Sequence, residues 1–288
     1  MKFFISFTLF LIVLTSCSVK KHQVRHSKKT KVFLLAGQSN MDGRAKASGL
    51  SEIDKQRLKK AQKNVTLYYN FGEGKPLDTT KVAEHTAKKF GADYLFGPEL
   101  FFGIKMSEKY PDHKIVLIKR SRGGMSLYGA WNPDWSLEKA IIMKEQKQPK
   151  LYSEFIKYSK EVLSKLSDFE ICGMLWVQGE TDSGKRFGSK PANDYEGNLK
   201  NLISSVREDV NKPNLPFLLF QVGGGNVVKG MKNTAKEDEN VILIPQKINK
   251  NSKFYFERNP APIGHYVTKS MKKIGEYFFE FYITNFSN

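Results

Sequence analysis

Continuous apolar runs and amphipathic helical stripes alternate along this chain. The apolar runs predict five buried strands, at residues 32–36, 114–119, 171–177, 217–222 and 241–244. Apolar residues also recur at spacings of three and four over residues 155–166, 195–210 and 267–282, which predicts helices that each bury one face. Because right-handed crossovers place such helices on both sides of a parallel sheet, the pattern predicts an α/β protein. We expect a three-layer α/β/α sandwich around a mostly parallel, five-stranded sheet.

Residues 49–91 interrupt this pattern. The segment is polar and rich in lysine, and it carries isolated aromatic residues such as Tyr68, Tyr69 and Phe71. Aromatic rings serve both sugar stacking and ordinary packing. Two interpretations therefore stay open: an excursion that lines a substrate groove, or a peripheral surface loop.

The N-terminus has the pattern of an export signal. Lys2 precedes an apolar stretch at residues 3–14, and residues 14–17 read Leu-Thr-Ser-Cys. This tetrapeptide resembles a bacterial lipobox, which implies a signal peptide at residues 1–16 and a lipid on Cys17 that anchors an exported lipoprotein in the cell envelope. An ordinary secretory signal with an incidental cysteine is the alternative. Residues 17–30 are polar and predict a flexible tether, which leaves residues 31–288 as one domain.

The charge balance is strongly basic, with 47 Lys and Arg against 29 Asp and Glu and a net charge of +18. A balance of this kind is typical of nucleic-acid-binding proteins. Here the basic residues are mostly lysines scattered along helix faces, without a nucleic-acid-binding motif, so we expect a solvated surface and no nucleic-acid partner. Attraction to an anionic polysaccharide is a second interpretation. The other cysteine, Cys172, lies in an apolar run and is expected to be a buried, inert thiol.

Ser39 is the strongest candidate for a catalytic residue. It lies in the run Gly37-Gln38-Ser39-Asn40-Met41, directly after the first predicted strand. Open α/β folds bind their ligands at the carboxyl ends of strands, so a serine at this place would face substrate. A helix cap is the structural alternative for such a serine.

Four blocks in chain order resemble those of the SGNH-hydrolase superfamily, in the branch of sialate O-acetylesterases and of acetylxylan esterases of carbohydrate esterase family six. The blocks are Gly37 to Met41 with Gly43-Arg44, Gly123-Gly124-Met125-Ser126-Leu127 with Trp131, Trp176 to Asp182 around Gln178-Gly179-Glu180, and His265-Tyr266 with Gly275. One position departs from the family, since Met125 stands where the second block usually has threonine. The resemblance covers nearly the whole mature chain. It implies a flavodoxin-like sandwich and a carboxylic ester hydrolase.

The resemblance implies that Ser39 is the nucleophile and that His265 takes its proton. His265 is also the histidine that remains by position, because His22 and His26 lie in the tether, His85 in the polar segment and His113 before a strand. Many members have an aspartate three residues before the histidine, where this chain has Pro262.

The acid that would orient His265 is therefore open. The resemblance offers Glu180, in the third block. Asp182, Glu257 and a histidine without an acid partner are the alternatives.

By the same resemblance, the backbone N–H groups of Ser39 and Gly124 and the side-chain amide of Gln178 form the oxyanion hole. Arg44, Asn40 and Asp182 are candidate substrate contacts, although we favour a role in fixing the loops. No cofactor or metal is expected, because the histidines are dispersed, the carboxylates lack ligand spacing, and no phosphate loop or dinucleotide fingerprint occurs.

Together these features predict a serine carbohydrate O-acetylesterase that releases acetate from an acetylated polysaccharide or glycan. The alternative is a surface lipoprotein that binds carbohydrate without cleaving it, which only Pro262 and Met125 favour. A lipid or thioester substrate would need an exposed apolar channel, and no segment suggests one.

Overall fold

The computed structural model describes Met1 and residues 29–287. Apart from Met1, the predicted signal peptide lies outside these residues, as do Cys17 and all but the end of the predicted tether. Thr30, assigned to the tether on sequence, already begins the first strand.

A seven-stranded sheet forms the middle of the molecule, in the order β10-β9-β8-β1-β7-β3-β4. The strands are β1 (Thr30–Gly37), β3 (Val65–Tyr69), β4 (Lys75–Pro76), β7 (Ile115–Ser121), β8 (Phe169–Val177), β9 (Phe217–Phe220) and β10 (Val241–Ile244). All run parallel except β4, which pairs antiparallel to β3 at the edge. The parallel α/β sheet predicted from the apolar runs is confirmed.

Two strands were missed, so the prediction of five was wrong in number. β3 and β4 lie inside the polar segment 49–91. In β3, Val65 and Leu67 are buried while the residues between and after them are partly exposed. A strand that buries one face alternates with period two and lacks the continuous apolar run of the inner strands.

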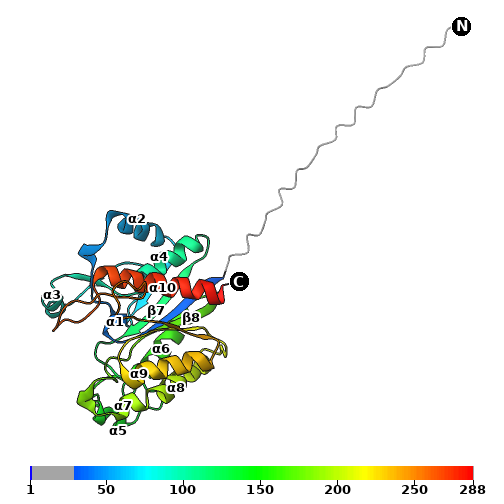
Figure 1. The fold of residues 1–288 in the computed structure, drawn as a ribbon. Coiled ribbons are helices and arrows are strands. Elements are labelled where there is room, and N and C mark those ends of the chain that lie inside the picture. Colours follow the sequence, from blue (N-terminus) through cyan, green and yellow to red (C-terminus); the bar gives the residue numbers. More distant parts are fainter. Residues whose placement is uncertain (2–28, 288) are drawn as a thin grey trace.

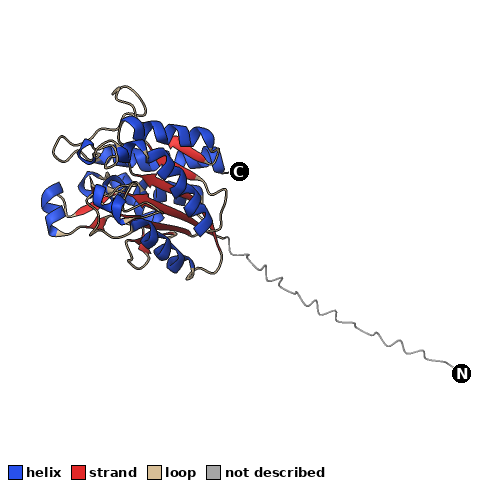
Figure 2. Ribbon diagram, turned by 90° about the horizontal axis from the view of Figure 1, so that it is seen from below, coloured by secondary structure: helices blue, strands red, loops and turns tan. Residues whose placement is uncertain are grey.

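Helices cover both faces of the sheet, as Figures 1 and 2 show. The helices of one face are α2 (Glu52–Ala61), α4 (Glu99–Lys109) and α10 (Thr268–Phe286), and those of the other are α6 (Leu151–Leu163), α8 (Tyr195–Asp209) and α9 (Gly225–Glu237). Shorter helices are α1 (Ser39–Asp42), α3 (Glu84–Phe90), α5 (Leu137–Ile142) and α7 (Lys190–Asn193), with 3₁₀ turns at Ala47–Gly49 and Lys185–Phe187. The three predicted helices correspond to α6, α8 and α10.

A small antiparallel sheet stands beside the main one, in the order β2-β6-β5. Its strands are β2 (Ala45–Lys46), β5 (Thr80–Lys81) and β6 (Tyr94–Phe96). The segment after Gly49 is therefore ordered, which the sequence pattern did not reveal. It contains the helices α2 and α3 and the strands β3, β4, β5 and β6.

β1 lies between β7 and β8 in the centre of the sheet, and its side chains from Val32 to Ala36 are fully buried. This position brings the residue after β1 to the middle of the sheet's carboxyl edge. Among residues 29–287, no helix combines the length and apolar character needed to cross a membrane.

Candidate active site

Ser39 opens the short helix α1 directly beyond β1, at the carboxyl edge of the sheet. The turn between them requires glycine at position 37, where φ is +150° and a Cβ would lie 2.2 Å from the carbonyl oxygen of Val177. The next residue, Gln38, is buried and its backbone N–H donates to the same carbonyl at 3.0 Å. These contacts hold the backbone while the side chain of Ser39 stays partly exposed.

The Gly123-Gly124 loop after β7 approaches the serine closely. A Cβ on Gly123 would lie 3.4 Å from the Cβ of Ser39, and Gly124 has φ +75°, a conformation that favours glycine. Neither the N–H of Ser39 nor that of Gly124 donates a hydrogen bond to another of the described residues. Two backbone donors without a partner among the described residues thus belong to the serine and to the loop that approaches it, and an oxyanion hole is built from donors of this kind.

Gln178 lies close to these loops, but its amide is not free. The side chain is fully buried, and Nε2 donates to Asp182 Oδ2 at 2.5 Å and to the carbonyl oxygen of Met125 at 3.2 Å. The expectation that this amide donates to the oxyanion is therefore corrected. Burial of the side chain directs its N–H groups into the loops.

Asp182 connects the second and third blocks. Its carboxylate is buried and accepts the backbone N–H groups of Leu127 at 3.0 Å and Tyr128 at 2.8 Å. Burial raises the pKa of this carboxyl to about 7, against the opposing effect of its hydrogen bonds from Gln178, Leu127 and Tyr128. A buried side chain used in this way does not contact substrate, so the loop-fixing role holds for Asp182.

Glu145 has a similar role and was missed on sequence. Its buried carboxylate accepts N–H groups of Ser126 and Ala130 and the hydroxyl of Ser126, at 2.7 to 2.9 Å. Glu145 lies in a polar stretch between α5 and α6, where nothing in the sequence pattern indicates that a charged side chain is buried. It fixes the loop that carries Gly123 and Gly124.

His265 lies in the loop before α10, with its ring against Phe90 of α3 at a centroid distance of 5.3 Å. Its Nδ1 lies 2.5 Å from the carbonyl oxygen of Ile263. A carbonyl can only accept, so Nδ1 carries the proton and Nε2 is left as the basic nitrogen. Burial, and secondarily the positive charges of Arg44, Lys89 and Arg258, lowers the pKa of His265 against the raising effect of the Ile263 hydrogen bond.

None of the three candidate acids bonds to His265. Glu257 is exposed, Asp182 is used in the loops, and Glu180 Oε1 accepts Asn40 Nδ2 at 2.7 Å. The other oxygen, Oε2, is buried without a hydrogen bond, and burial raises the pKa of this carboxyl. The backbone carbonyl of Ile263, and not Glu180, therefore accepts the Nδ1 proton of His265. Ile263 is only two residues before His265, so its carbonyl oxygen lies within hydrogen-bond distance of the ring.

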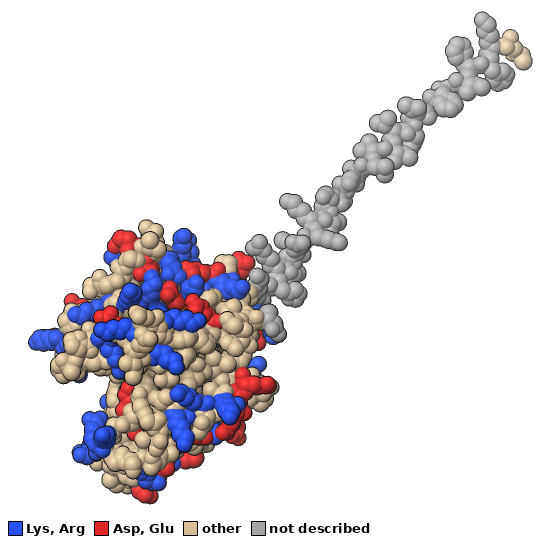
Figure 3. Space-filling view, in the orientation of Figure 1, with Lys and Arg blue, Asp and Glu red and all other residues tan. Residues whose placement is uncertain are grey.

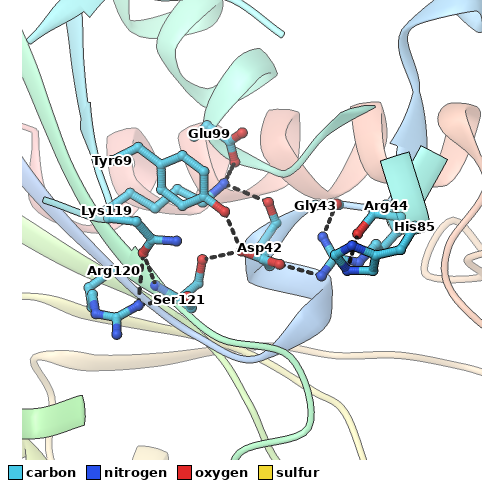
Figure 4. A network of polar contacts seen from close by, with 11 residues as sticks. Asp42, Gly43, Arg44, Tyr69, His85, Glu99, Lys119, Arg120 and Ser121 are labelled. Atoms are coloured by element: carbon cyan, nitrogen blue, oxygen red, sulfur yellow. Dashed lines mark hydrogen bonds and ion pairs between the residues drawn. The ribbon is translucent and has the colours of Figure 1, made fainter. Parts of the chain in front are cut away.

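Arg44 belongs to a polar network around Asp42, the last residue of α1. Its Nη1 donates to the carbonyl oxygen of Gly43 at 2.7 Å, and its Nη2 pairs with Asp42. Asp42 also accepts the hydroxyls of Tyr69 and Ser121 (Figure 4). The ion pair predicted for Arg44 is confirmed, while Asp42 is a positioning residue that the sequence did not single out.

A cavity of about 620 Å³ opens beside Arg44 and Tyr266. Its lining includes four basic side chains, Arg44, Lys46, Lys269 and Lys272, and one acidic side chain, Asp54. Over the face drawn in Figure 3, basic side chains are spread with acidic ones between them, without one continuous basic stripe. Among the described residues, no group of three His, Cys, Asp or Glu is placed to hold a metal ion.

Comparison with known proteins agrees with this arrangement. A family model described as "Carbohydrate esterase, sialic acid-specific acetylesterase" matches residues 29–284. A "Probable carbohydrate esterase" of Arabidopsis thaliana is 35% identical over 81 residues, which are 27% of this chain and 29% of that protein. The matched segment thus spans less than a third of this relative.

Solved structures share the fold. A protein from Arabidopsis thaliana superposes with a TM-score of 0.64 at 20% identity, over 90% of this chain and 99% of that one. NanS gives 0.61 at 14% identity, over 89% and 97% of the two chains. A carbohydrate acetylesterase from Xanthomonas citri gives 0.58 at 16% identity, over 88% and 56%.

The sandwich, with a serine at the end of its central strand, defines an α/β protein with the fold that these solved structures share. Within that class, the family model covers nearly all of the described residues. The chain belongs to the sialic acid-specific acetylesterase family of carbohydrate esterases, and so to the carboxylic ester hydrolases.

Proposed function

We propose that this protein is a serine O-acetylesterase that releases acetate from an acetylated polysaccharide or glycan. The observation that carries the proposal is the approach of the Gly123-Gly124 loop to Ser39, together with N–H groups of Ser39 and Gly124 that have no partner among the described residues. A tetrahedral oxyanion needs donors at this place, and they act strongly because they are fixed before the reaction.

The reaction starts when Ser39 Oγ attacks the acetyl carbonyl carbon while Nε2 of His265 takes the hydroxyl proton. The oxyanion accepts the two backbone N–H groups. Collapse of the intermediate breaks the bond to the sugar oxygen, which leaves with the proton from His265. A water molecule then attacks the acetyl carbon of the acetyl-serine while Nε2 of His265 takes its proton; the bond between Ser39 Oγ and the acetyl group breaks, Oγ takes the proton back from His265, and acetate leaves the free enzyme.

In this proposal, Glu180 supports the serine without touching His265. The hydrogen bond from Asn40 connects the third block to the residue after Ser39. The carbonyl of Ile263 fixes the tautomer of His265, which is one of the two tasks of a triad acid. The other task is to stabilise the positive charge that forms on the imidazole, and a neutral carbonyl does this only weakly. The lipid on Cys17 remains a proposal from sequence, and it would hold the esterase in the cell envelope.

Ser39→Ala tests the proposal. Wild-type protein should hydrolyse 4-nitrophenyl acetate and release acetate from acetylated glycans, and the variant should lose at least about three orders of magnitude in turnover. Circular dichroism and a cooperative melt serve as the control for folding. Equal rates for the two proteins would refute the enzyme and favour a carbohydrate-binding lipoprotein on the same fold.

A further inference from the structure

A second cavity, of about 630 Å³, lies at the β3–β4 edge of the main sheet. We call it the edge pocket; its lining includes Gln62, Tyr69, Lys75, Asp78, Lys81 and Tyr94. The volume falls in the range of small-molecule sites. The described active-site residues do not use this cavity, apart from the Tyr69 contact to Asp42.

One end of the edge pocket, at Tyr69 and Gly72, lies at the same carboxyl edge of the sheet as Ser39. β1, β7 and β3 are parallel neighbours in this order, so their carboxyl ends lie on the same side. Ser39 follows β1, and Tyr69 is the last residue of β3. Two strand spacings separate β1 from β3, about 10 Å. A glycan with its acetylated unit at Ser39 therefore reaches the edge pocket with a short further length of chain.

Tyr69 connects the two places physically. It lines the edge pocket, and its hydroxyl donates to Asp42, the last residue of the nucleophile helix (Figure 4). Lys119 lies over its ring, 4.6 Å from the centroid. The wall of the edge pocket is thus fixed to the helix that presents Ser39.

The walls combine an exposed ring with hydrogen-bonding groups. Tyr94, on β6, is 48% exposed, which is unusual for so large an aromatic side chain in a strand. Near it, Gln62 Nε2 donates to Asp78 Oδ2 at 3.2 Å, and both side chains keep further hydrogen-bonding capacity. A pyranose offers an apolar C–H face for the ring and hydroxyls for the amide and carboxylate.

The charge of the edge pocket indicates a neutral ligand. Two acidic residues, Glu73 and Asp78, are balanced by two basic ones, Lys75 and Lys81. The cavity beside Arg44 and Tyr266 has four basic side chains and one acidic side chain. Of these two cavities, only the one beside Arg44 and Tyr266 has the excess positive charge that would attract an anion.

We propose that the edge pocket binds a neutral sugar unit of the same glycan chain, some units away from the acetylated one. The proposal rests on the proposed function and makes the substrate an oligosaccharide or polysaccharide rather than a single acetylated sugar. Tyr94 is the stacking platform, and it sets affinity for the chain without taking part in acetyl transfer.

The test is a comparison of long and short substrates. Acetylated xylotetraose and acetylated mannotetraose are assayed beside 4-nitrophenyl acetate with wild-type protein, Tyr94→Ala and Tyr94→Phe. Ile141→Ala is the matched control, because it removes a side chain of 54% exposure on α5, which does not line the edge pocket. Cooperative melts establish that each variant is folded.

We expect Tyr94→Ala to raise KM for the tetrasaccharides roughly two- to tenfold, the scale of one aromatic contact, with kcat unchanged. Tyr94→Phe and Ile141→Ala should keep the wild-type KM, and 4-nitrophenyl acetate should be turned over equally by all four proteins. An unchanged KM for both tetrasaccharides in Tyr94→Ala, or an equal loss on 4-nitrophenyl acetate, would overturn the proposal.

Direct binding separates this proposal from the esterase. Unacetylated xylotetraose and mannotetraose are titrated into wild-type protein and Tyr94→Ala by calorimetry, with a trigalacturonate as the charged comparison. Binding of a neutral tetrasaccharide that Tyr94→Ala weakens supports the edge pocket even if no ester is cleaved. Absence of such binding, or tighter binding of trigalacturonate that depends on Tyr94, contradicts it.

Discussion

The buried ion pair behind the nucleophile helix gives a prediction that can be worked out in numbers. Lys119 Nζ lies 2.8 Å from Glu99 Oε2 and 3.0 Å from the carbonyl oxygen of Asp42, and both charged side chains are about 1% exposed (Figure 4). In Lys119→Met the Glu99 carboxylate keeps its burial and loses its counter-charge. Removal of one partner from such a pair costs about 3–5 kcal/mol.

The loss is measured by thermal and urea unfolding. At about 2–4 °C per kcal/mol for a domain of this size, Lys119→Met should melt roughly 6–20 °C below wild type. The matched control is Lys55→Met, which breaks an exposed pair with Glu52 at 2.6 Å and should cost less than about 1 kcal/mol.

A double variant shows whether the cost comes from the unpaired charge. Adding Glu99→Gln to Lys119→Met removes the carboxylate and keeps an oxygen for the N–H of Gly97, which Glu99 Oε1 accepts at 3.0 Å. The double variant should be more stable than Lys119→Met alone. Equal losses of stability for Lys119→Met and Lys55→Met would refute the reasoning. So would a double variant whose loss of stability equals the sum of the losses measured for Lys119→Met and for Glu99→Gln alone.

Three further predictions concern catalysis. Glu180→Gln should lose less than about tenfold in turnover, because the side-chain oxygen of glutamine can still accept the hydrogen bond from the Asn40 amide. A loss of about two to four orders of magnitude in a variant that still melts cooperatively would instead assign Glu180 the role of triad acid. The base of the reaction is neutral His265, and its lowered pKa lets the neutral form persist below the ordinary titration range of histidine. Because the charge of Lys89 contributes to this lowering, Lys89→Gln should raise the pKa of His265 and move the acidic limb of the kcat/KM profile to higher pH. An unmoved limb would show that Lys89 has no influence on His265. Chelation with EDTA should leave turnover unchanged, and loss that one added metal ion restores would refute metal-free acyl transfer.

The sequence determined the inner part of the fold and the position of the proposed nucleophile after its first strand. β1, β7, β8 and β9 are buried on both faces along most of their length, and their continuous apolar runs can be recognised without a structure; the edge strand β10 has a similar apolar run although Ile242 and Leu243 are partly exposed. The nucleophile block is local, since the glycine at position 37 and the serine two residues later are fixed by a single turn. The amphipathic stripes likewise gave α6, α8 and α10.

Only the tertiary structure decided how the loops are held. The partner of His265 is a backbone carbonyl, and a carbonyl has no residue type by which a sequence could reveal it. Glu145 and Glu99 are acidic residues that the chain buries, the first among backbone N–H groups and the second against Lys119. Their positions depend on contacts between distant segments, whereas strand and helix patterns depend on neighbours along the chain, and this difference is why the elements could be predicted and the scaffold of the site could not.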